Sequence, residues 1–132
     1  MKILLIGSNG QLGQEVKALA PKDISGVKYR FKTLTRNELD LEDKISCKKV
    51  IKDEKPDWLI NCAAYTKVDE AESEKIKAQL VNGIAIEIFS EELKNFSGKL
   101  IQISTDFVFS GKQGFPYTTD QTLEPINEYG RS

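Results

Sequence analysis

The chain has 132 residues, a length that suits one compact domain with a single hydrophobic core. Its 19 lysines and arginines against 20 aspartates and glutamates give a formal net charge of −1, with no long block of like charge, which argues against a nucleic-acid partner. No apolar run approaches the roughly 18 residues that a membrane span needs, and the N-terminus lacks a signal-peptide pattern. We therefore expect a cytoplasmic protein without a membrane partner.

The chain contains no histidine and two cysteines. This composition excludes Ser-His-Asp and Cys-His nucleophilic catalysis. Cys47 and Cys62 are widely spaced and have no histidine to join them, so we expect two reduced thiols and no zinc. The acidic run 69–74 is better explained as the first turn of a helix than as a metal site.

Strand and helix patterns alternate along the chain. The sequence predicts strands over residues 2–6, 27–34, 58–61 and 99–104. It predicts helices over residues 11–19, 43–53 and 69–94, followed by a loop up to Glu128. The apolar faces are expected at Ile45, Val50 and Ile51 in the second helix and at Ile76, Leu80, Ile84 and Ile88 in the third.

This alternation predicts the α/β class, because parallel strands need a crossover. We expect one domain over residues 1–132, with a doubly wound parallel sheet of about four strands in the order 3-2-1-4. The carboxyl ends of its strands, at Ile6, Leu34, Asn61 and Ser104, would share one edge. Ligands would bind at that edge, near the switch between the first and fourth strands.

A glycine-rich loop, Gly7-Ser8-Asn9-Gly10-Gln11-Leu12-Gly13, follows the first strand and opens the first helix. In this context Gly7 permits the turn, Gly10 lets the backbone approach a pyrophosphate, and Gly13 lets the helix pack on the sheet. The free N–H groups of the helix start favour an anion there. The loop predicts a dinucleotide site and makes residues 1–132 an expected NAD(P)-binding Rossmann domain; a purely structural turn is the alternative.

The end of the second strand bears on the choice of dinucleotide. Arg36 could pair with a 2′-phosphate and Thr35 could hydrogen-bond it, which favours NADP. The alternative is a solvated surface arginine. Glu38, close by, keeps NAD open as a cofactor.

Several motifs occur in one order from end to end of the chain: 7–13, 39–41 (LDL), 61–72 (NCAAYTKVDEAE), 104–109 (STDFVF) and 129–132 (YGRS). Together they resemble the extended branch of the short-chain dehydrogenase/reductase superfamily, and within it the dTDP-4-dehydrorhamnose reductase (RmlD/RfbD) family. The resemblance implies NAD(P)H-dependent reduction of the 4-keto group of a dTDP-sugar in dTDP-L-rhamnose and polysaccharide biosynthesis.

The resemblance implies that Tyr129 donates the proton and that Thr105 orients the carbonyl. Hydride addition leaves an incipient alkoxide that needs a positioned acid, and nearby positive charge must lower the tyrosine pKa. A surface aromatic and a strand-end cap are the alternatives for these two residues. The implied cofactor-binding residues are Gly7, Asn9, Gly10, Gln11, Leu12, Gly13, Arg36, Asp40, Leu41, Ala63, Ala64, Tyr65 and Asn82, and the implied substrate-binding residues are Thr66, Val68, Thr105, Asp106, Phe107 and Tyr129.

Two of these roles have open alternatives, since Asp40 could merely start a turn and Asn82 could be a structural amide. Two positions depart from the family pattern. Cys62 stands where alanine is usual, and Phe107 stands where tyrosine is common. The second departure removes a hydroxyl and blurs the sugar assignment.

The family's catalytic lysine would fall one position beyond Ser132. We therefore expect a cofactor-binding N-terminal part of a reductase, without its substrate-binding C-terminal portion and with little turnover alone. An unpaired fourth strand could also pair with a second copy in a homo-oligomer. The alternatives are a non-catalytic dinucleotide-binding or regulatory module, resembling the regulatory subunit of methionine adenosyltransferase, and another nucleotide-sugar reductase or epimerase.

Overall fold

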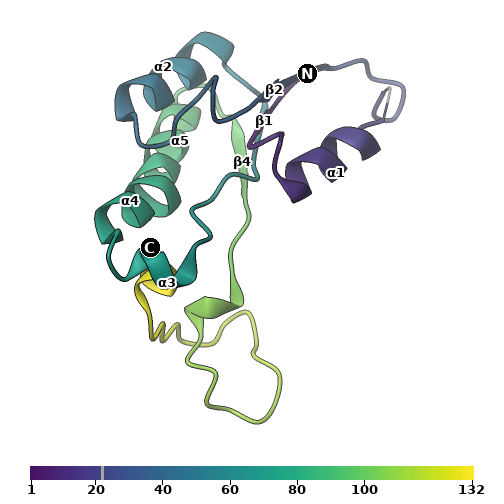
Figure 1. The fold of residues 1–132 in the computed structure, drawn as a ribbon. Coiled ribbons are helices and arrows are strands. Elements are labelled where there is room, and N and C mark those ends of the chain that lie inside the picture. Colours follow the sequence, from purple (N-terminus) through teal and green to yellow (C-terminus); the bar gives the residue numbers. More distant parts are fainter. Residues whose placement is uncertain (22) are drawn as a thin grey trace.

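A computed structural model describes residues 1–21 and 23–132 and shows a four-stranded sheet between layers of helices (Figure 1). The strands are β1 (Lys2–Ile6), β2 (Arg30–Leu34), β3 (Trp58–Asn61) and β4 (Lys99–Gln102). All three strand pairs are parallel. The predicted α/β class with a doubly wound parallel sheet is confirmed.

The predicted strand order is wrong: the order is β2-β1-β3-β4. The chain crosses to β2 on one side of β1 and then returns to place β3 on the other side, so the switch lies between β1 and β3. β1 is an interior strand, and its Leu4, Leu5 and Ile6 are fully buried. The exposed or half-buried Arg30 and Lys32 suit β2 to the edge of the sheet.

Two strands are shorter than predicted. Ile24 and Val27 pair with each other across a tight turn in which Ser25 and Gly26 adopt positive φ angles of 53° and 79°. Because residues 24–27 form this turn, β2 begins only at Arg30. β4 ends at Gln102, and the chain beyond it turns toward the site.

The helices are α1 (Gln11–Leu19), α2 (Lys44–Glu54), α3 (Val68–Ala71), α4 (Lys75–Gln79), α5 (Ala85–Lys94) and α6 (Glu128–Arg131). α1 and α2 agree with the prediction to within one residue. Asp43 fixes the start of α2 by accepting hydrogen bonds from the N–H groups of Ile45 and Ser46. α1 covers one face of the sheet, whereas α2 and α5 pack together on the other (Figure 1).

The long helix predicted over residues 69–94 is divided. α3 and α4 are separate, and a π-helical turn, η1 (Leu80–Ile84), joins α4 to α5. A short 3-10 turn, η2 (Asp106–Val108), follows β4 within the predicted loop.

The predicted apolar faces are partly wrong. Ile45 and Ile76 are 80% and 78% exposed, whereas Cys47, Ala78 and Phe89 are buried. The π-helical turn changes the helical period, so a regular four-residue spacing does not stay on one face across it. In the part of the chain that the structure describes, no helix has the length and apolar character to cross a bilayer.

Candidate functional site

A cleft of about 830 Å³ opens at the carboxyl edge of the sheet. Its walls come from the segments that follow β1, β2, β3 and β4, together with α4, η1 and α6. In a doubly wound sheet this edge, beside the switch point, is where ligands bind.

The cleft brings together most of the residues that the sequence singles out. Those that line it are Gly7, Asn9, Gly10, Gln11, Leu12, Arg36, Asp40, Leu41, Ala63, Ala64, Tyr65, Thr66, Asn82, Thr105 and Tyr129. The lining does not include Gly13, Val68, Asp106 or Phe107. Gly13 is buried in α1, Val68 begins α3, and Asp106 and Phe107 lie in η2.

Two glycines of the loop are required by the backbone itself. Gly7 has φ 77°, and a Cβ there would lie 2.6 Å from the Ala63 nitrogen in the segment after β3. A Cβ on Gly13 would overlap the carbonyl group of Gly7, with its carbon only 2.9 Å away. These contacts hold β1, α1 and the end of β3 close together.

The start of α1 is open to an anion. Its N-cap is Gly10, so no side chain caps the helix. The N–H groups of the first turn therefore have no side-chain acceptor from the N-cap, and Gln11 and Leu12 of this turn line the cleft. A Cβ on Gly10 would meet nothing closer than the Gly7 oxygen at 3.4 Å, so this edge of the loop is spacious. The cradle fits a pyrophosphate.

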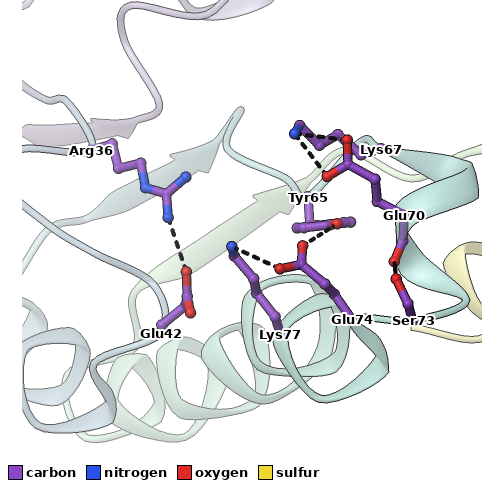
Figure 2. Close-up of polar contacts among 8 residues, drawn as sticks. All are labelled: Arg36, Glu42, Tyr65, Lys67, Glu70, Ser73, Glu74 and Lys77. Atoms are coloured by element: carbon purple, nitrogen blue, oxygen red, sulfur yellow. Dashed lines mark hydrogen bonds and ion pairs between the residues drawn. The ribbon is translucent and has the colours of Figure 1, made fainter.

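Two acidic residues near the end of β2 have different roles (Figure 2 shows one of them). Glu38 folds back and accepts hydrogen bonds at 2.8 Å from both the backbone N–H and the hydroxyl of Thr35. These bonds, the backbone one first, lower the pKa of Glu38. Glu42 instead lines the cleft and pairs with Arg36, Nη2 to Oε1 2.9 Å. Glu38 and Thr35 are thus hydrogen-bonded to each other, whereas Arg36, with a side chain that is 67% exposed, is a surface arginine that pairs with Glu42.

Tyr65 is held by its side chain. Its hydroxyl donates to Glu74 at 2.6 Å, and the Lys77 ammonium lies 5.9 Å from its ring centroid and 3.5 Å from Glu74 (Figure 2). The hydrogen bond to Glu74, with burial and nearby negative charge, raises the pKa of Tyr65 to about 12. Tyr65 therefore keeps its proton and presents a neutral ring to the cleft.

Asn82 holds the backbone of the same residue. Its Oδ1 accepts from the Tyr65 N–H at 2.8 Å, and its Nδ2 donates to the Tyr65 carbonyl at 3.1 Å and to the Ser132 hydroxyl at 2.9 Å. Asn82 lies in η1, so the π-helical turn carries the amide that joins the loop after β3 to the end of α6. The structural role of Asn82 has direct support, although the residue also lines the cleft.

Tyr129 is carried into the cleft by α6, which is anchored on α3 and α4. The Glu128 N–H donates to Glu72 at 2.9 Å, and the Glu128 carboxylate pairs with Lys75 at 3.3 Å. Asn127 caps the helix by accepting from the Gly130 N–H. The hydrogen bond with Lys75, first among several contacts, lowers the pKa of Glu128, so this anchor stays ionised at neutral pH.

Thr105 caps η2, because its hydroxyl oxygen accepts from the Phe107 N–H at 3.3 Å. It also lines the cleft, as does Tyr129. The Phe107 ring packs edge to face on Tyr129 with 5.3 Å between centroids. Thr105 therefore caps this 3-10 turn and not the end of a strand, since β4 ends at Gln102, and the cap holds the hydroxyl at the edge of the cleft.

Two charged residues of the cleft, Glu42 and Lys77, were not anticipated from the sequence. Glu42 directly follows the Leu39-Asp40-Leu41 motif, and the Asp40 carboxylate accepts its N–H at 3.1 Å. That adjacency was a usable signal. Lys77 belongs to no motif, and only the fold brings it to the cleft.

Both cysteines are free. Burial raises the pKa of Cys47 to about 11 and also raises the pKa of Cys62, which lines the cleft. Neither is poised as a thiolate nucleophile at neutral pH.

Known proteins share this arrangement. A dTDP-4-dehydrorhamnose reductase of Burkholderia thailandensis is 39% identical over 133 residues, which cover 100% of this chain and 43% of that protein. The crystal structure of such a reductase from Clostridium acetobutylicum superposes with a TM-score of 0.89 at 32% identity, covering 99% of this chain and 45% of the other. The crystal structure of the Bacillus anthracis dTDP-4-dehydrorhamnose reductase in complex with NADP superposes with a TM-score of 0.87 at 32% identity. The match covers 98% of this chain and 45% of the other.

The chain thus spans less than half the length of these relatives. The similarity extends over the sheet, the glycine loop and the segment that carries Tyr129. All 132 residues match one family, and the chain belongs to the RmlD substrate binding domain family.

Proposed function

We propose that the cleft binds a nicotinamide dinucleotide, NADPH in preference to NADH, for the reduction of the 4-keto group of a dTDP-sugar. The observation that carries this proposal is that Thr105 and Tyr129 line the same cleft as the glycine loop. The relatives named dTDP-4-dehydrorhamnose reductase support that substrate class. The chain would be the cofactor-binding part of such an enzyme.

The dinucleotide would lie along the carboxyl edge of the sheet. Its pyrophosphate would meet the uncapped start of α1, where the backbone at Gly10 leaves room. Arg36 would face the 2′-phosphate of NADPH, which is the basis for the preference. Ala63, Ala64 and Tyr65 would line the part of the cleft between the two ends of the cofactor.

The bound nicotinamide would supply the hydride. Tyr129 would hold the proton that the new alkoxide takes up, and the hydroxyl of Thr105 would orient the carbonyl. Tyr65 cannot replace Tyr129 as the acid, because the hydroxyl proton of Tyr65 is held in its hydrogen bond to the Glu74 carboxylate. Thr66 lines the cleft and would contact the sugar nucleotide. Val68, Asp106 and Phe107 are not among the residues that line the cleft, so any contact they make with the sugar nucleotide would lie outside it.

Turnover by the 132 residues is expected to be slight, since the lysine that the family motif places after Tyr129 is not among them. A phenol without a neighbouring cation is a weak acid near pH 7 and protonates an alkoxide less effectively. Steady reduction of dTDP-4-dehydrorhamnose by this chain alone would contradict this expectation.

Binding tests the proposal directly. Fluorescence titration with NADPH should show saturable binding, and Gly10→Ala should weaken it by about tenfold, because the new methyl group occupies the pyrophosphate edge. Thermal unfolding should be nearly unchanged in Gly10→Ala, since its Cβ meets only an ordinary contact at 3.4 Å.

Gly13→Ala is the matched comparison. Its Cβ overlaps the Gly7 carbonyl group, so it should lower the free energy of unfolding by about 1–3 kcal/mol. If the unaltered chain binds neither NADPH nor NADH at millimolar concentration, the proposed function is wrong. If both are bound but no longer chain containing these residues reduces a dTDP-4-keto sugar, a non-catalytic binding module is the better description.

A further inference from the structure

The proposed mechanism gives no role to the carboxylate of Glu42. Its side chain is 32% exposed and points at Arg36 across the end of the cleft near β2 (Figure 2). Both residues line the cleft. The ion pair therefore lies where Arg36 would meet the ribose end of the dinucleotide.

The other acidic side chains nearby have different partners. Glu38 accepts from the N–H and hydroxyl of Thr35, and Glu74 accepts from Tyr65 and pairs with Lys77. Glu42 is the carboxylate that contacts Arg36, at 2.9 Å. The Asp40 carboxylate accepts the Glu42 N–H at 3.1 Å, which fixes the backbone from which Glu42 extends.

A carboxylate at this position acts differently on the two dinucleotides. The 2′-phosphate of NADPH must approach Arg36 while Glu42 stays close, so the two anions repel each other and compete for one guanidinium. The 2′-hydroxyl of NADH is a hydrogen-bond donor, and Glu42 can accept it without leaving Arg36. The pair would thus weaken NADPH binding and strengthen NADH binding.

We propose that Glu42 is a specificity-determining residue. It reduces the preference for NADPH that Arg36 would otherwise establish, and its carboxylate accepts a hydrogen bond from the 2′-hydroxyl of NADH. This inference rests on the proposed function, because it requires a dinucleotide in the cleft. It assigns the ribose-facing carboxylate to Glu42, which lines the cleft, in place of Glu38, which is not among the lining residues and whose Oε2 accepts two bonds from Thr35.

The test is a set of dissociation constants for NADPH and NADH, measured by fluorescence titration on the full 132-residue chain. Glu42→Gln should tighten NADPH binding by about tenfold and weaken NADH binding by about threefold, because the negative charge is lost while the shape is kept. Glu42→Ala removes the same negative charge together with most of the side chain. It should change the ratio of the NADPH and NADH dissociation constants in the same direction as Glu42→Gln. Glu42→Asp should keep a ratio close to that of the unaltered chain.

Arg36→Gln supplies the second half of a double-mutant cycle. In that background Glu42→Gln should no longer tighten NADPH binding, since the guanidinium for which the anions compete is absent. Glu91→Gln, at an exposed position of α5 outside the cleft lining, is the control and should leave both constants unchanged.

A failure of the proposed function and a failure of the role of Glu42 give different results. If the unaltered chain binds neither dinucleotide, the proposed function is overturned and this inference with it. If both bind and neither Glu42→Gln nor Glu42→Ala changes the ratio of the two constants, only the role of Glu42 is overturned. The role of Glu42 is likewise overturned if Glu42→Gln acts equally in the Arg36→Gln background.

Discussion

Two tyrosines line the cleft, and their contacts separate their roles. The hydroxyl of Tyr65 donates to Glu74, whereas Tyr129 packs its ring on Phe107. A phenol bound to a carboxylate is a poor acid, because its ionisation would place two negative charges side by side. Tyr65 is therefore poorly suited to donate a proton, which agrees with the role proposed for Tyr129.

The contact of Tyr65 predicts an alkaline transition. Its folded-state pKa of about 12 lies above the ordinary value of 10, so the neutral phenol is stabilised by folding. That stabilisation is fully present below pH 10 and is lost as the pH rises toward 12. An ultraviolet titration should contain a component with a pKa of about 12, and Tyr65→Phe should abolish it. Survival of this component after the substitution would contradict the assignment.

At the scale of elements, the π-helical turn η1 connects three parts of the site. It carries Asn82, whose amide bonds the loop after β3 and the end of α6 at once. π-helical turns are rare in proteins, and those that occur are often found at functional sites. Here the turn brings a side-chain amide to the backbone of the loop after β3.

Removal of that amide should loosen both attachments. We expect Asn82→Ala to lower the free energy of unfolding by about 1–3 kcal/mol, since it leaves the Tyr65 N–H and carbonyl without their partner. Hydrogen exchange at the Tyr65 amide should become faster. Asn37→Ala, at an exposed position, should change stability by less than about 0.5 kcal/mol. An unchanged exchange rate at Tyr65 in Asn82→Ala would show that the amide does not hold this loop.

At the scale of the whole molecule, β4 forms one end of the sheet. Ile101 and Ile103, on and just after this strand, are 41% and 46% exposed. An exposed apolar edge favours pairing with another strand, so self-association remains a prediction for this chain.

Sedimentation velocity over a range of concentrations tests it. We expect the average mass to rise with concentration and Ile101→Lys to suppress the rise, because a charged side chain opposes edge pairing. Ile76→Lys, on α4 and 78% exposed, should have no effect. A monomer at every concentration, or equal effects of both substitutions, would count against edge pairing.

The sequence was sufficient for features that depend on neighbouring residues. The glycine loop, α1, α2 and the parallel strands are local patterns, and the structure contains them. The strand order is not local: it depends on which side of β1 the chain takes after α2, and the polar composition of Arg30 and Lys32 was the one hint that β2 is an edge strand.

The site shows the same division. Residues inside motifs, such as Gly7 and Thr105, were found from the sequence. Lys77 was missed because only the folding of α4 against the cleft brings it there, and the exposed side of Ile76 was mistaken for a core face because the π-helical turn breaks the regular period.

The amide of Asn82 also does for one residue what a neighbouring strand does for a whole segment. By accepting from the N–H and donating to the carbonyl of Tyr65, it reproduces the pairing that a further strand would offer. Past Asn61 the backbone is held by two side-chain amides, that of Asn61 on Ala63 and that of Asn82 on Tyr65. The loop over the cleft can then leave the plane of the sheet while its polar backbone stays satisfied. A side-chain amide carries both an acceptor and a donor, so one residue can satisfy both backbone groups of Tyr65 while this loop lines the cleft.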